Sequence, residues 1–182
     1  MINRSVFFQD IRHTLFDGRL TQEQVTGISL ILDYWERKHP VADIRFIAYS
    51  LATTYHETNK AMVPLEELGK GAGKSYGKLD PVTNQIYYGR GLVQLTWKYN
   101  YIKQGTKLGL NLVNFPDLAL TSLVAVEILV EGMLAGDFTG IGLSHYFSTH
   151  VDDPTNARRI INGLDKASII AYYHAHFLAA LT

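Results

Sequence analysis

Cysteine is absent from this chain of 182 residues. Its absence excludes a disulfide framework and every mechanism that uses a thiol nucleophile, and it fits folding in a reducing compartment. An excess of charge of either sign is lacking as well, because 17 basic residues balance 17 acidic ones. The overall charge therefore indicates neither a nucleic-acid partner nor an anionic membrane as partner.

Long uninterrupted apolar runs are also missing. The longest apolar tract, residues 118–135, contains Glu127 and Glu131, which lie four residues apart on one stripe of a helix. This pattern predicts a buried central helix and no stable membrane insertion. Near the N-terminus only Val6, Phe7 and Phe8 form an apolar run, too short for the core of a secretory signal, so we expect no export sequence in the mature chain.

The hydrophobic content of 47% is sufficient for one well-buried core, and most of the local patterns are helical. Thr21 and Gln24 have the spacing of a capping box before an apolar stripe, which predicts a helix over residues 21–38. A second stripe at helical spacing predicts a helix over residues 44–55.

Three further helices are expected. The N-terminal segment, residues 1–20, is predicted to pack as a helix, and another helix is expected to start within residues 93–102. A C-terminal helix is predicted with Asp165 as its N-cap. The side chains expected to face the core are Val6, Phe7, Ile11 and Leu15 in the first of these helices, and Ile170, Tyr173, Phe177, Leu178 and Leu181 in the last.

Between residues 58 and 91 the helical pattern stops. Six of the fifteen glycines fall between Gly69 and Gly91. Long irregular segments inside compact domains are usually binding or catalytic loops. The alternatives are a mobile surface insertion or a small hairpin, in which residues 85–88 would be a short strand.

Two carboxyl sites flank the start of this irregular segment. Glu57 lies at the end of the second predicted helix, and the pair Glu66 and Glu67 follows nine residues later. An inverting glycosidase needs one carboxylic acid to protonate the leaving oxygen and one carboxylate to activate water. The spacing suggests such a pair. Glu57 does not lie on the apolar stripe, however, and the alternative is that it is a solvated glutamate at a helix end.

Patterns for nucleotide and metal binding are incomplete. The Gly73-Lys74-Ser75 sequence resembles the end of a phosphate-binding loop, but Leu68 occupies the place of the required first glycine. The His56-Glu57 pair begins a zinc-protease pattern, but Lys60 occupies the position of its second histidine. We therefore expect no metal and no cofactor.

Residues 87–101 are rich in aromatic rings, amides and hydroxyls. Aromatic faces cover the apolar surface of sugar rings, and the polar groups pair with sugar hydroxyls. The segment therefore favours glycan binding, with burial in the core as the alternative for each ring.

Four motifs in order resemble glycoside hydrolase family 19, specifically its phage and prophage endolysin branch, which is related to chitinases. The resemblance implies one catalytic domain over residues 1–182. Its fold would be mainly α, with two lysozyme-like lobes, a substrate cleft and a small irregular or β-hairpin region. The motifs are Tyr55-His-Glu-Thr58, Pro64-Leu-Glu-Glu67, Tyr88-Gly-Arg-Gly91 with Gln94-Leu-Thr96 and Asn100-Tyr101, and Arg158-Arg-Ile-Ile-Asn-Gly163.

The resemblance also implies roles for individual residues. Glu57 matches the general acid and Glu66 the general base, with Glu67 as the competing choice, and Thr96 matches a residue that holds the attacking water. Glu57 would need a raised pKa, whereas Glu66 would need to stay ionised. Six further residues match positions that bind substrate or, for the arginines, positions that bind sugar or organise the carboxylates. They are Tyr88, Arg90, Gln94, Asn100, Arg159 and Asn162.

Taken together, these features predict a monomeric peptidoglycan hydrolase that cuts β-1,4 glycosidic bonds with inversion during host lysis. Its partner would be the peptidoglycan glycan strand. It would accumulate in the cytoplasm of the host bacterium and act in the periplasm or cell wall, with access that depends on a holin. The alternatives are a chitinase and a glycan-binding or phage structural module without turnover. A formal net charge of zero is less suited to adhesion to an anionic wall than a basic surface would be.

Overall fold

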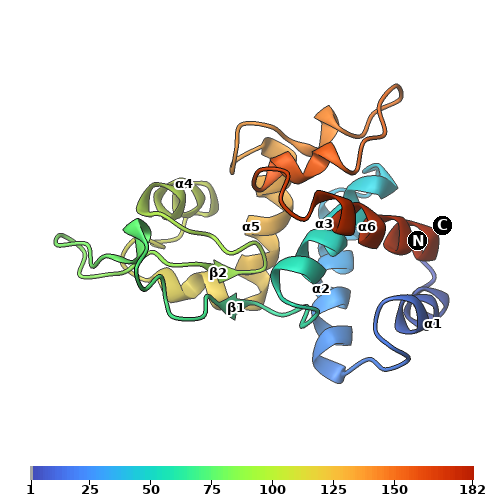
Figure 1. The fold of residues 1–182 in the computed structure, drawn as a ribbon, viewed down its shortest axis with the longest axis horizontal. Helices are drawn as coiled ribbons and strands as arrows, with labels where there is room; N and C mark the ends of the chain where they lie inside the picture. The colour runs from blue at the N-terminus through green and yellow to red at the C-terminus, as the bar shows by residue number, and fades with distance from the viewer. Residues whose placement is uncertain (1) are drawn as a thin grey trace.

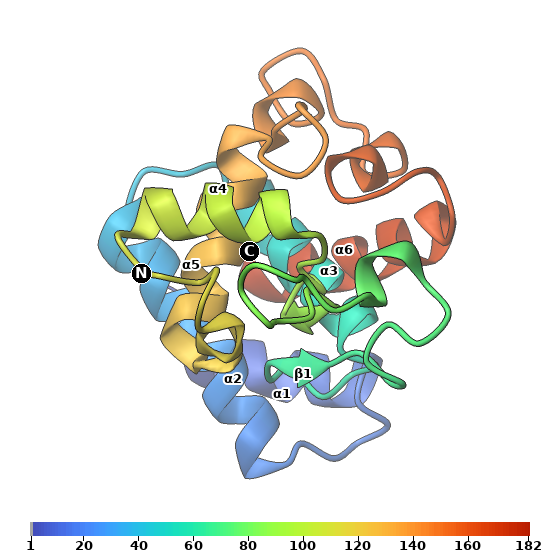
Figure 2. The same cartoon turned by 90° about the vertical axis from the view of Figure 1, so that its left-hand side faces the viewer.

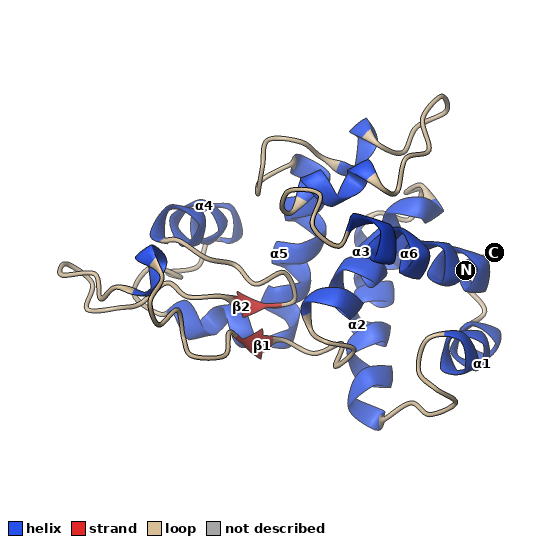
Figure 3. Cartoon of the chain, viewed as in Figure 1, coloured by secondary structure: helices blue, strands red, loops and turns tan. Residues whose placement is uncertain are grey.

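Helices dominate the computed structural model, which describes residues 2–182 (Figure 1, Figure 3). Two short strands form one antiparallel sheet in which Glu66 pairs with Arg90. Within residues 2–182, the α-helices are α1 (Arg4–Thr14), α2 (Gln22–Lys38), α3 (Ile44–Glu57), α4 (Lys98–Leu108), α5 (Ser122–Ala135) and α6 (Ala167–Leu181). The strands are β1 (Leu65–Glu66) and β2 (Arg90–Gly91), and the 3-10 turns are η1 (Ser75–Gly77), η2 (Pro116–Leu120), η3 (Leu143–His145) and η4 (Asn156–Ile160).

The elements form two lobes on either side of α5. The larger lobe contains α1, α2, α3 and α6, and the smaller lobe contains the sheet, the long loops around it and α4 (Figure 1). Helix α3 packs along α6, and the C-terminal end of α3 faces β1 (Figure 2). The predicted mainly α, lysozyme-like fold is thereby confirmed.

Helices α2 and α3 confirm the two strongest helical predictions. The Thr21 hydroxyl accepts from the Gln24 amide at 3.2 Å, and the Gln24 side chain accepts from the Thr21 amide at 2.8 Å, which completes the capping box. Helix α3 continues two residues beyond the predicted stripe and ends at Glu57. Nearly every side chain of α3 from Ile47 to Tyr55 is buried, which makes this helix the centre of the larger lobe.

The apolar tract also behaves as predicted. Helix α5 is buried along most of its length, and one edge carries Glu131, which accepts from Tyr34 Oη at 2.9 Å. This carboxylate lies 2.8 Å from His39 Nε2, so α5 is tied to α2 and to the residue that caps it. Between residues 2 and 182 the structure contains no helix that is long and apolar enough to cross a bilayer.

Helix α4 starts at Lys98, within the expected range of residues 93–102 and after the positive φ angles of 52° and 68° at Gln94 and Trp97, which interrupt a helix. Two other local predictions were wrong. No strand forms over residues 85–88, since β2 begins only at Arg90. Lys166, with φ 61°, takes the N-cap position of α6 in place of Asp165, and no side chain caps that helix.

The N-terminal helix is present but rotated slightly from the expected orientation. Phe7 and Ile11 are fully buried and Leu15 nearly so, as predicted, whereas Val6 is half exposed. Met1, the first residue of the predicted segment, lies outside the described residues.

Candidate active site

A tight corner after α3 determines where Glu57 lies. Asn59 and Lys60 adopt φ angles of 47° and 69°, which end the helix. The buried Thr58 hydroxyl donates to the Thr54 carbonyl at 2.7 Å and accepts from the Met62 amide at 2.9 Å. Glu57 is thus the last helical residue before a hydrogen-bonded turn that leads to β1.

Helix α2 presses against this corner at Gly27. A Cβ atom at Gly27 would lie 1.9 Å from the Met62 carbonyl oxygen, so only glycine fits. The close approach joins the corner to the helical core of the larger lobe. The position of Glu57 therefore depends on backbone packing as well as on its own contacts.

Glu57 is paired with an arginine from the C-terminal part of the chain. Arg158 Nη1 donates to Glu57 Oε1 at 2.5 Å, and the two side chains are only 6% and 15% exposed. Arg158 Nε also donates to the Asp165 carbonyl at 3.2 Å, which holds the guanidinium in place. The alternative of a solvated glutamate at a helix end is therefore wrong.

Arg159 was expected either to organise the carboxylates or to bind sugar, but the arginine at Glu57 is its neighbour Arg158. Arg159 is exposed, and its Nε lies 3.5 Å from Asn156 Oδ1. Both residues belong to the turn η4, where consecutive side chains point in different directions. Sequence reasoning missed Arg158 although the quoted motif contained it.

Glu66 lies on β1 and is the more open of the two neighbouring carboxylates. Its side chain is 37% exposed, accepts from Tyr88 Oη at 2.6 Å and lies 3.2 Å from Lys70 Nζ. The hydrogen bond from Tyr88 and then the contact with Lys70 lower the pKa of Glu66 below its ordinary value. The environment therefore favours the ionised form that a general base requires.

Glu67 is engaged in a different way. It accepts from Tyr76 Oη at 2.7 Å and from the Gly89 amide at 3.0 Å, so it fastens the loop after β1 to the segment before β2. Successive side chains of a strand point to opposite faces, which separates Glu66 from Glu67. The geometry favours Glu66 over Glu67 for contact with water and substrate.

Two predicted substrate-binding residues, Tyr88 and Arg90, are buried beneath Glu66. The Arg90 guanidinium lies 3.6 Å from the centre of the Tyr88 ring, donates to Asp117 at 2.9 Å and to Tyr101 Oη at 3.1 Å, and its side chain is only 4% exposed. Burial contradicts direct sugar contact by Tyr88 and by Arg90. The two residues form a stack beneath the hydroxyl bound to Glu66, which fits the other role expected of Arg90, that of organising the carboxylates.

A groove of about 540 Å³ separates residues 93–100 from the segments 138–141 and 159–163. It brings together residues from the smaller lobe and from the η4 region, which are far apart in sequence. The predicted site residues that line it are Gln94, Thr96, Asn100, Arg159 and Asn162.

Two of these residues also support the groove wall. Gln94 Nε2 donates to the Leu65 carbonyl at 3.1 Å and lies 3.4 Å from the Gly91 carbonyl, so it links both strands of the sheet. Asn100 Nδ2 donates to the Thr96 carbonyl at 2.9 Å. Thr96 is consequently held in a fixed backbone position at the mouth of the groove.

Trp97 and Tyr99 are exposed rings in the same groove that the residue-by-residue prediction left out. Their ring centres lie 6.2 Å apart in a stacked arrangement, and Tyr76 meets Trp97 edge-on at 5.6 Å. Exposed, stacked rings at a polar groove are suited to the apolar faces of sugars. The ring-rich pattern of residues 87–101 contained this signal without showing which rings face outward.

Comparison with known proteins gives the groove a family context. Residues 41–130, which include Glu57, Glu66, Thr96 and Asn100, match the family model of chitinase class I, glycoside hydrolase family 19. The matched segment, just under half of the chain, is similar to the catalytic domain of that family. The match ends within α5, before the η4 segment that supplies Arg158.

Individual curated relatives match the chain over short stretches. Chitinase 11 of Oryza sativa subsp. japonica is 69% identical over 76 residues, which is 41% of this chain and 29% of the relative. Inactive chitinase-like protein 1 of Hevea brasiliensis is 58% identical over 38 residues, 21% of this chain and 12% of the relative. The chain thus matches well under a third of the length of either protein.

The solved structure of chitinase C from Streptomyces griseus has the same fold. It superposes with a TM-score of 0.65 over 99% of this chain and 76% of that chain, at 23% sequence identity. The shared fold therefore extends over nearly the whole chain, beyond the residues that the family model matches.

Proposed function

We propose that this chain is a glycoside hydrolase that cleaves β-1,4 bonds of an N-acetylated glycan by an inverting acid/base mechanism. One observation carries the proposal: two carboxyl groups lie in separate surroundings beside the groove that Trp97 and Tyr99 line. Glu57 is partly buried and paired with Arg158, whereas Glu66 is more exposed and its pKa is lowered by Tyr88 and Lys70. An inverting glycosidase needs two carboxyl groups, one as acid and one as base.

Each residue has a defined step in this mechanism. Glu57 gives its proton to the leaving glycosidic oxygen, and the Arg158 guanidinium stabilises the carboxylate that remains. Glu66 accepts a proton from the attacking water, whose hydroxyl bonds to the anomeric carbon from the opposite face. Thr96 helps to orient that water. No covalent intermediate forms, and the product has the inverted anomeric configuration.

We favour the peptidoglycan glycan strand as substrate and host lysis as the setting. Four motifs in the order of the endolysin branch and the absence of cysteine support this assignment. The enzyme would accumulate in the bacterial cytoplasm and reach the wall once a holin has permeabilised the inner membrane. It would act there as a monomer.

Chitin is the second candidate substrate. The family model is that of chitinase class I, and the rice relative is named a chitinase. Chitin and peptidoglycan share a β-1,4-linked N-acetylated backbone, so the same acid and base can serve either.

The third candidate is a glycan-binding module without turnover, for which the Hevea relative, named inactive, provides a precedent in the same family. The pairing of Glu57 with Arg158 and of Glu66 with Tyr88 supports catalysis, because a binding surface has no need of an acid and a base in separate environments.

The test uses purified protein on outer-membrane-permeabilised Gram-negative cells and on chitin, with mass spectrometry after reducing-end labelling. We expect muropeptides with a new reducing sugar, and a fall in turnover of roughly 10²- to 10⁴-fold in Glu57→Gln with glycan affinity retained. Glu23→Gln, an exposed glutamate on α2, is the matched control. Chitin oligomers alone would assign the protein as a chitinase, and no fragments from either substrate would indicate a binding module.

The stereochemical claim has its own measurement. NMR of the products immediately after cleavage is expected to show the inverted anomer. Retention of configuration would contradict the roles given to Glu57 and Glu66, because it requires a nucleophile in place of the base.

A further inference from the structure

A lysine-rich loop borders the site on the side of Glu66. We call residues 68–79 the lysine loop; it carries Lys70, Lys74 and Lys78 at intervals of four. The loop is folded tightly on itself, because a Cβ atom at Gly77 would lie 1.8 Å from the Gly71 carbonyl oxygen. Its lysines therefore project from a defined backbone.

Tyr76 attaches the lysine loop to the groove. Its hydroxyl donates to Glu67 at 2.7 Å, and its ring meets Trp97, a groove residue, at 5.6 Å between centres. The loop is thus joined both to the neighbour of Glu66 and to an exposed ring of the groove wall. A glycan that lies across Trp97 passes beside the loop.

The charges of the loop are only partly neutralised. Lys70 pairs with Glu66, but Lys74 and Lys78 are exposed and, across residues 2–182, neither has a carboxylate within 4.0 Å. The nearby Asp80 is already bound by Lys98 at 2.7 Å and by the Thr83 hydroxyl at 3.0 Å.

The facing wall of the groove also carries positive charge. Arg159 is exposed there and lines the groove. Exposed positive charge thus lies on the loop that contacts Trp97 and on the groove wall that carries Arg159, although the whole chain has a formal net charge of zero. A chain that gathers unpaired positive charge at one site is suited to an anionic ligand.

We propose that Lys74 and Lys78 bind carboxylates on the peptide stems of a peptidoglycan strand while its sugars occupy the groove. The inference rests on the proposed function and selects between its first two substrates. Chitin has no charged substituents, so these lysines would add nothing to its binding. Peptide stems place carboxylates beside the sugar backbone, and exposed charges at the rim of a site mainly raise the rate of association.

The experiment compares Lys74→Ala/Lys78→Ala with the unmodified chain on three substrates. These are Gram-negative sacculi, which lack wall phosphate polymers, the same glycan strands after enzymatic removal of the stems, and chitin oligomers. We expect kcat/KM to fall about tenfold on sacculi at low ionic strength, to fall less on stem-free strands, which keep only the lactyl carboxylates of muramic acid, and to stay unchanged on uncharged chitin oligomers. The difference on sacculi should shrink as salt is raised.

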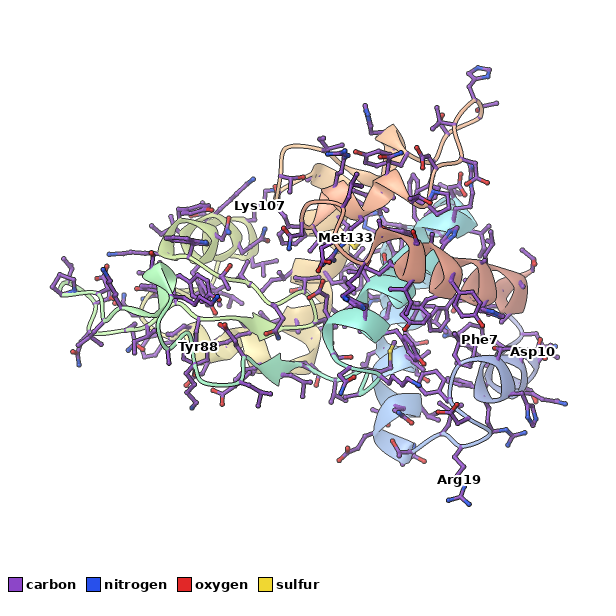
Figure 4. All side chains as sticks on the ribbon, in the orientation of Figure 1. Phe7, Asp10, Arg19, Tyr88, Lys107 and Met133 are labelled. Atoms are coloured by element: carbon purple, nitrogen blue, oxygen red, sulfur yellow. The ribbon has the colours of Figure 1, made fainter. Side chains whose placement is uncertain are left out.

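Arg12→Ala/Arg19→Ala is the matched control, because it removes two exposed charges from the larger lobe (Figure 4). Equal loss on all three substrates would contradict stem recognition and indicate a structural role for the lysines. No loss on sacculi, or the same loss in the control, would also overturn it.

Co-sedimentation with sacculi separates this inference from the proposed function. The test is made in the Glu57→Gln background, where binding is measured without cleavage. Reduced sedimentation on replacing Lys74 and Lys78 supports stem recognition even if the unmodified chain shows no turnover, whereas unchanged sedimentation overturns it. Absence of turnover in the unmodified chain would contradict only the hydrolase.

Discussion

The two candidate catalytic carboxylates are held by different kinds of structure. Glu57 ends a helix whose preceding turns are buried against α6, and its corner is pressed onto Gly27 of α2. Glu66 lies on a two-residue strand and is positioned by hydrogen bonds and a ring stack with Tyr88 and Arg90. Figure 4 shows Tyr88 in the smaller lobe, on the other side of α5 from Phe7 in the larger one.

This difference indicates which substitutions should affect each carboxylate. The acid depends on close packing, because the backbone around it has no room to move. The base depends on a few polar contacts at the surface, each of modest energy. Changes in the core should therefore act on stability and on Glu57 together, whereas changes near Glu66 should act on its ionisation.

The largest expected effect comes from Gly27→Ala. The added methyl group would clash with the Met62 carbonyl oxygen, so the corner after α3 must move. We expect the free energy of unfolding to fall by about 3 kcal/mol, with loss of turnover in the fraction that remains folded. Urea unfolding measures the first effect, and Thr26→Ala on the same helix is the exposed control. Unchanged stability would show that the corner is not packed against α2.

An effect of similar size, which develops only as the pH is lowered, is expected from His174, a buried member of the packed lobe. It is 2% exposed, stacks on Phe147 and lies beside Tyr49, and burial lowers its pKa from 6.5 to about 4. Asp152, Asp43 and Arg45 are the charged groups that act on it.

Between pH 6.5 and about 4 the unfolded chain binds a proton at His174 that the folded chain does not. Stability should therefore fall by about 3 kcal/mol over this range as the pH is lowered. His174→Leu should remove this part of the pH dependence, as measured by urea unfolding at pH 7 and pH 4, while His13→Gln, at an exposed site, should retain it. An identical pH dependence in His174→Leu would contradict the assignment.

The smallest effect is expected from Tyr88→Phe, which keeps the ring over Arg90 and removes the hydrogen bond to Glu66. Without that bond the pKa of Glu66 should rise toward its ordinary value, so activity should be lost at a higher pH on acidification. The pH profile of kcat/KM measures this shift, with a change of only a few-fold at the optimum.

Tyr76→Phe sharpens the same comparison, because it removes the corresponding bond to Glu67. If Glu66 is the base, this variant should leave the acid limb of the profile in place. If the acid limb of the kcat/KM profile shifts in Tyr76→Phe and stays in place in Tyr88→Phe, the base is Glu67.

Local patterns predicted the helices well. The capping box at Thr21 and the apolar stripes of α2 and α3 depend on neighbours three and four residues apart, which the sequence displays directly. The start of α4 was predicted only to within residues 93–102, because the positive φ angles at Gln94 and Trp97, which delay it to Lys98, occur at residues other than glycine. The predicted strand at residues 85–88 failed because sheet pairing needs a partner from elsewhere in the chain.

The candidate site was predicted in part. Thr96, Asn100 and Asn162 line the groove as residues of the quoted motifs. Tyr88 and Arg90 are buried, although contact with sugar was among the roles expected of them. The sequence alone does not show whether the polar end of a Tyr or an Arg meets solvent or another side chain.

The sequence by itself determined the helical segments, the central burial of α5 and the residue types of the candidate acid and base, because these depend on spacing and chemistry along the chain. Only the tertiary structure decided that Arg158, 101 residues away, meets Glu57, and that the Tyr88 hydroxyl donates to Glu66. The physical reason is that such contacts follow from how helices and turns pack in three dimensions, where neighbouring residues such as Arg158 and Arg159 point to different surroundings.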